Sequence, residues 1–182
     1  MKKLIILLFS LLLIQTGGYG ASSPRWEKMP ITVFVSDNNP EITLVKKAFL
    51  RWQNATGSTV RFKYVDAKDI NNANIVVFFT KRMYRPDRQG ETRYKYRTYP
   101  DGRQYLIPQV KIEIGQRHTG RPSEKLTDAQ MYRVILHEIG HSIGLSHTQD
   151  EADIMYEKGT WFGQKDLSQN DIKRAIQIYR QR

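Results

Sequence analysis

Apolar residues along the chain follow patterns that predict four strands. Ile31–Val35 is β-branched and aromatic and precedes a turn-forming segment, and Val60–Val65 alternates apolar with polar side chains. Ile75–Phe79 is a continuous apolar run, which is typical of a strand buried on both faces. Val110–Ile114 alternates again and ends at Gly115, which favours a strand at the edge of a sheet.

Apolar side chains at helical spacing predict three helices. The first carries one apolar stripe, and the other two begin at capping residues. These residues are Val45, Ala48, Phe49 and Trp52 for the stripe, Thr127 and Gln130 for the second helix, and Ser168 and Asp171 for the third. Strands that alternate with a helix near the start of the chain predict an α+β domain with a twisted, mixed sheet.

Residues 81–107 combine cations with tyrosines. From Arg93 to Tyr99 the two types nearly alternate, so an extended strand would place tyrosines on one face and cations on the other. Pro100–Gly102 predicts a turn, after which Tyr105–Ile107 can return as the second strand of a hairpin. Grooves for single-stranded nucleic acid use similar residues. No complete nucleic-acid signature accompanies them, so a solvated hairpin near the cleft is the preferred interpretation.

The stretch from His137 to His147 has the pattern H-E-x-x-H-x-x-G-x-x-H. On a helix, His137 and His141 project about 40° apart, so both imidazoles can reach one metal ion. A continuous helix would turn His147 away from that ion. Gly144 can end the helix, because glycine adopts the left-handed conformation at little cost, and can thereby return His147 to the same ion.

Three neutral imidazoles suit zinc and leave its fourth position for water. Zinc lowers the pKa of that water, and Glu138 beside the ligands is the candidate base. A bare H-E-x-x-H also arises by chance, and a lone histidine is more often a packed or surface residue. The full pattern, followed by Met155, favours zinc binding over these alternatives.

The stretch from His137 to His147 resembles the zinc-binding helix of the metzincins, and Asp153–Tyr156 resembles their methionine turn. Ala48–Thr56, Ala73–Phe79 and Leu167–Ile172 are similar to the first helix, third strand and last helix of the matrixins, the matrix-metalloproteinase type. This resemblance covers nearly the whole mature chain. It implies a zincin-like metzincin domain with a twisted, mixed five-stranded sheet, three helices and a cleft.

The resemblance also implies roles for individual residues. Met155 would form a hydrophobic floor beneath the zinc, and Tyr156 would belong to the wall of the pocket for the residue after the scissile bond. The strand that contains Val110 and Ile112 would border the cleft and pair with an extended substrate. Structural zinc ligands of matrixins include histidines in the segment that is basic here, and this segment has none. One catalytic zinc is therefore expected, and calcium stays undetermined.

The first twenty residues have the features of a secretory signal. Lys2 and Lys3 precede an apolar run from Leu4 to Ile14, and small residues follow at Gly18–Gly20. We expect residues 21–182 to form one mature domain without a membrane span, either secreted or periplasmic in a double-membrane bacterium. The sequence has no cysteine, so a propeptide cysteine that occupies the zinc is not expected.

The formal net charge of +11 has two interpretations. It can favour anionic partners such as envelope polymers, or it can serve solubility alone. The sequence leaves both open.

The sequence predicts a secreted, monomeric zinc endopeptidase that acts on proteins or peptides. Zinc held by the three histidines would bind water and polarise the scissile carbonyl, while Glu138 would take the water's proton and pass it to the leaving amine. The alternative is a zinc-containing binding module that holds an anionic polymer on the basic hairpin with little or no catalysis. Glu138 favours the peptidase, because a binding module needs no base beside an open zinc site.

Overall fold

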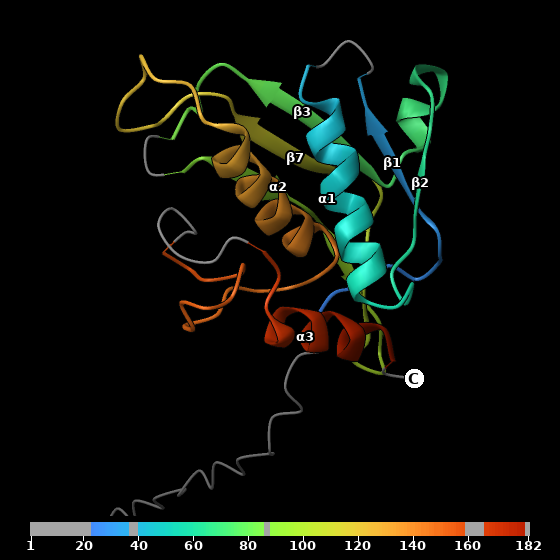
Figure 1. Cartoon of the computed structure of the whole chain (residues 1–182). Helices are drawn as coiled ribbons and strands as arrows, with labels where there is room; N and C mark the ends of the chain where they lie inside the picture. Colours follow the sequence, from blue (N-terminus) through green and yellow to red (C-terminus); the bar gives the residue numbers. More distant parts are fainter. Residues whose placement is uncertain (1–22, 37–39, 86–87, 159–165, 181–182) are drawn as a thin grey trace, which may run out of the picture.

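A computed structural model describes residues 23–36, 40–85, 88–158 and 166–180. Helices α1 (Ile42–Ala55) and α2 (Asp128–Ser142) lie side by side over one face of a five-stranded sheet, and α3 (Gln169–Arg180) lies below them (Figure 1). The predicted α+β class, with its mixed sheet and three α-helices, is confirmed. The predicted signal segment, residues 1–20, falls outside the described residues.

The sheet has the strand order β2-β1-β3-β7-β4. Strands β2, β1, β3 and β7 are parallel to one another, and β4 runs antiparallel to β7. The parallel pairing of β1 and β2 requires a crossover, which α1 supplies. The continuous apolar run lies in β3 at the centre, as predicted. The bounds are β1 Ile31–Val35, β2 Phe62–Tyr64, β3 Ile75–Thr80, β4 Gly90–Arg93 and β7 Val110–Gly115, with a 3₁₀ helix, η1, at Ala67–Asn72.

The prediction that Val110–Ile114 forms an edge strand is wrong. Ile112 of β7 pairs with Val77 of β3 on one side and with Thr92 of β4 on the other. Its alternating pattern arises because one face of the strand packs on the helices, and this pattern does not report whether a further strand lies alongside. Among the described residues, β4 forms the sheet edge on the side of β7, so a substrate cannot pair with β7 as expected.

The predicted hairpin is present but shorter than expected. Strands β5 (Tyr96–Thr98) and β6 (Gln104–Leu106) form a separate antiparallel ribbon. The single strand expected from Arg93 to Tyr99 is wrong, because the chain leaves the large sheet after β4 and begins the ribbon two residues later. Arg25 fixes the ribbon to the start of the domain: its N–H donates to the Gln104 carbonyl at 3.1 Å, and its carbonyl accepts from the Leu106 N–H at 2.8 Å.

The capping residues start α2 and α3 as predicted. Thr127 Oγ1 accepts from the Gln130 N–H at 3.3 Å, and Gln130 Oε1 accepts from the Thr127 N–H at 2.9 Å. The same exchange joins Ser168 and Asp171 at 2.9 Å in each direction. In the part of the chain that the structure describes, no helix is both long and apolar enough to cross a bilayer.

Trp52 connects the two helices that cover the sheet. Its side chain is fully buried, and its Nε1–H donates to the Leu136 carbonyl of α2 at 3.0 Å. The other residues of the predicted stripe, Val45, Ala48 and Phe49, are buried with it. The stripe therefore sets the position of α2, the helix that carries the predicted metal ligands.

We expect Trp52→Ala to lower the free energy of unfolding by about 3–5 kcal/mol, because it leaves a cavity between α1, α2 and the sheet. Leu50→Ala on the exposed side of the same helix is the matched control, since Leu50 is 54% exposed and its loss should change stability by about 0.5 kcal/mol or less. Denaturant unfolding measures both. Equal effects of the two substitutions would contradict this packing.

Candidate active site

Gly144 turns the chain after the helix that carries His137 and His141. The Leu145 N–H donates to the Gly140 carbonyl at 2.9 Å, and the Gly144 N–H donates to the His141 carbonyl at 3.0 Å. These two bonds form a Schellman motif, and Gly144 has the positive φ, +99°, that the motif requires. A Cβ at Gly144 would also collide with the Pro24 carbonyl oxygen. The predicted glycine exit is therefore confirmed.

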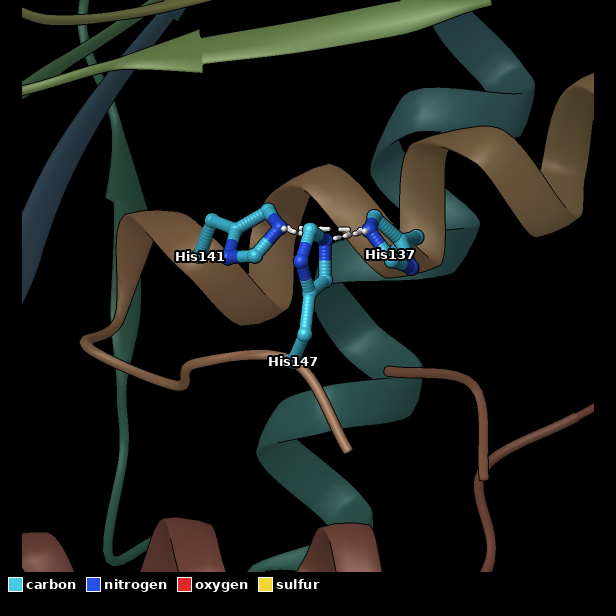
Figure 2. A group of neighbouring side chains, drawn as sticks. All are labelled: His137, His141 and His147. Atoms are coloured by element: carbon cyan, nitrogen blue, oxygen red, sulfur yellow. Dashed lines mark hydrogen bonds between the residues drawn. The ribbon is translucent and has the colours of Figure 1, made fainter. Parts of the chain in front are cut away.

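The turn brings the three predicted ligands together (Figure 2). The Nε2 atoms of His137, His141 and His147 lie 3.0 to 3.2 Å from one another. His137 Nδ1 lies 2.7 Å from the Ile154 carbonyl and His141 Nδ1 lies 2.8 Å from the Leu145 carbonyl. Because a carbonyl only accepts, both Nδ1 atoms carry the hydrogen, and both neutral rings direct an Nε2 lone pair toward the other ligands.

This arrangement fits a zinc ion. Tetrahedral zinc with Zn–N distances near 2.0–2.1 Å separates its nitrogen ligands by about 3.3 Å, close to the observed spacing. Burial lowers the pKa of His137 to about 4, with a smaller contribution from His147, and that of His141 to about 3, with a contribution from His137. Burial also lowers the pKa of His147. The imidazoles are therefore neutral at pH 7, which is the form that binds a metal.

Met155, the residue of the predicted methionine turn, packs against the helix that carries His137 and His141. Its side chain is fully buried, and its sulfur lies where a Cβ at Gly140 of α2 would have to sit. The Asp171 carboxylate of α3 accepts from the Ile154 N–H at 2.7 Å and from the Met155 N–H at 3.3 Å. Since the Ile154 carbonyl orients His137, Asp171 supports a ligand through the turn. The sequence predicted only a capping role for Asp171.

Glu138 faces the same cleft and is 5% exposed. Burial raises the pKa of its carboxyl group to about 7, Glu91 adds to the rise, and hydrogen bonding by Thr92 opposes it. Thr92 Oγ1 lies 2.6 Å from Glu138 Oε2. A carboxyl group with a pKa near neutrality is suited to accept and release a proton, and a cation on the histidines would lower this pKa again.

The cleft has a volume of about 510 Å³. Among the described residues, its lining includes neither Val110, Ile112 nor Tyr156. The Tyr156 hydroxyl donates to Glu151 at 3.2 Å. The sequence of residues 159–163 is compatible with a loop that closes the same pocket or with a cover for the core, and these residues fall outside the described part of the chain. The lining comes from β4 and its flanks, from α2 and from the methionine-turn side: Arg88, Gln89, Gly90, Glu91, Thr92, Tyr94, Val134, His137, Glu138, His141, His147, Glu157 and Lys158.

Comparison with known families agrees with this geometry. The family model described as matrixin matches residues 25–180. The chain belongs to the matrixin family. The three histidines of the cleft are placed to hold a metal ion.

Several curated matrixin relatives are interstitial collagenases. The rabbit (Oryctolagus cuniculus) and pig (Sus scrofa) proteins are each 28% identical over 86% of this chain and 33% of their own length. The protein of the frog Aquarana catesbeiana is 30% identical over 82% of this chain and 34% of its own length. This matrixin chain thus spans about a third of the length of the curated relatives that it matches.

We expect the purified protein to bind about one zinc ion per chain and His147→Ala to weaken zinc binding strongly, because two imidazoles then remain. His118→Ala is the matched control, since His118 is the one histidine outside the cluster. Metal analysis after dialysis against a competing chelator measures retention. Equal retention by both variants would exclude His147 as a ligand.

Proposed function

We propose that this matrixin is an exported zinc endopeptidase that acts as a monomer on protein or peptide substrates. The observation that carries the proposal is the convergence of three neutral imidazole nitrogens beside a buried carboxyl group in one cleft. Residues 1–20 support export, because Lys2 and Lys3 precede an apolar run from Leu4 to Ile14.

In the proposed reaction, the three histidines, Thr92 and Glu138 have different roles. The three histidines would hold a zinc ion, which when bound would supply Lewis acidity for the attacking water and the scissile carbonyl. Thr92 contacts Oε2 of Glu138, which leaves Oε1 as the oxygen available to the water's proton. Glu138 then delivers this proton to the leaving amine, so one group acts as base and later as acid.

The substrate is expected to pair with β4 rather than with β7. Strand β4 bonds to β7 along one edge, its other edge pairs with no further strand among the described residues, and Gly90 and Thr92 line the cleft. An extended peptide can add to this free edge as a further strand. The role expected for Val110 and Ile112 is therefore assigned to β4. Tyr156, which directly precedes the lining residues Glu157 and Lys158 in the sequence, stays a proposed part of the pocket wall.

Replacing Glu138 by Gln should leave zinc bound and lower turnover by about 10²-fold or more, because Gln cannot accept the proton. A library of unstructured peptides, analysed by mass spectrometry with and without a zinc chelator, measures cutting by both proteins. Substantial chelator-sensitive cutting by E138Q would overturn the assigned role of Glu138.

Backbone methylation of a substrate tests the strand pairing. For a peptide that the protein cuts, single N-methyl groups at alternate positions should raise KM, because they remove hydrogen bonds to the β4 edge. Methyl groups at the intervening positions, whose N–H groups point away, are the matched control. Uniform tolerance of methylation along the peptide would contradict pairing with β4.

A polymer-binding role is the second candidate. Lys95, Tyr96 and Arg97 are exposed around β5, and the formal charge is +11. These features favour contact with anionic polymers. A binding module would still bind an anionic polymer after the loss of zinc or of Glu138, whereas the proposed peptidase would no longer cleave peptides.

A further inference from the structure

Strand β4 directs two side-chain positions toward the helix that carries the metal ligands. Residues 90 and 92 lie on the same face, because side chains alternate along a strand. The first is glycine, and a Cβ there would lie 2.7 Å from both Cγ and Oε1 of Glu138. The second, Thr92, hydrogen-bonds to Glu138. The edge strand therefore contacts Glu138 at two consecutive positions of one face.

The Thr92 hydroxyl binds Glu138 through two oxygens. Thr92 Oγ1 lies 2.6 Å from the carboxylate Oε2 and 3.0 Å from the backbone carbonyl of the same residue. The shorter distance falls in the range of a hydroxyl that donates to a charged carboxylate, about 2.5–2.7 Å. The hydroxyl has one hydrogen, so the carbonyl is its alternative acceptor whenever Oε2 does not take it.

Glu138 depends on this contact for its orientation. Among the described residues, Thr92 supplies the one hydrogen bond to the Glu138 carboxylate, whose residue is 5% exposed. A buried carboxylate that loses its donor either rotates toward water or stays unsatisfied. The other oxygen, Oε1, lies against the edge strand, where a side chain at position 90 would otherwise sit.

We propose that Thr92 is a positioning residue that holds the Glu138 carboxylate in its productive orientation, with Gly90 leaving the room that this orientation needs. The inference rests on the proposed endopeptidase function. The β4 edge then has two functions: its backbone receives the substrate, and its inward side chains hold the general base. A register shift of this strand would disturb both.

The test replaces Thr92 by Val, which keeps the branched shape but removes the hydroxyl, and by Ser, which keeps the hydroxyl. In the zinc-loaded protein, T92V should lower kcat by about 10- to 100-fold with little change in KM, and T92S should restore most of kcat. Thr80→Val is the matched control. Its hydroxyl also bonds to a backbone carbonyl, that of Arg82 at 3.1 Å, but at the end of β3 outside the cleft lining.

A second measurement separates this inference from the peptidase function. The infrared carboxylate band of Glu138, obtained by difference against E138Q, should move in T92V and keep its wild-type position in T92S and T80V. This band reports the hydrogen bond whether or not a substrate is cut. Zinc content and thermal unfolding of each variant show that it is folded and loaded.

The outcomes are distinct. If the Glu138 band moves in T92V but the wild-type protein cuts no peptide, the proposed function is overturned and the Thr92 contact stands. Full kcat in T92V, an effect confined to KM, or equal losses in T92V and T92S would overturn the positioning role. An unmoved band in folded T92V would overturn the contact itself.

Discussion

Three imidazole nitrogens that face one another within 3.2 Å are the constraint on which the site depends. Two of them present lone pairs inward because their other ring nitrogens donate to carbonyls. Such an arrangement is favourable only around a cation, so the protein must hold it by other contacts until a metal binds. These contacts come from the Gly144 turn, from the methionine turn and, through Asp171, from the last helix.

The candidate metal centre therefore joins three successive segments of the chain: the end of α2, the segment after the Gly144 turn, and the methionine turn. His137 and His141 come from α2, His147 follows the turn, and the Thr148 N–H donates to the Met155 carbonyl at 2.9 Å. The chain has no cysteine, so no disulfide fixes this arrangement. Zinc that binds the folded arrangement and not the unfolded chain adds its binding free energy to stability.

Local patterns were sufficient for the ligands and for most of the fold. The ligand spacing, Gly144 and the capping residues act within a few positions of one another, so the sequence shows them directly. The edge of the sheet was different. Gly90–Arg93 is short and polar and has no apolar alternation, and β7 alternates because one face is buried. Neither pattern shows which strands are neighbours, so the alternation in β7 wrongly predicts an edge strand.

Thr92 and Asp171 show why supporting contacts are harder to predict than ligands. Thr92 acts on a residue 46 positions away, and Asp171 reaches the methionine turn 17 positions away. Each contact exists only because a strand or a helix end is docked in one register. A capping aspartate has acceptor sites beyond those that its helix uses, which was the only sequence signal for the second role of Asp171. For Thr92 no local signal exists, because its partner is defined by the pairing of β4 with β7 and by the packing of α2 on both. The orientation of Glu138, the proposed general base, is thus a property of the tertiary fold, whereas its position beside the histidines is a property of the motif.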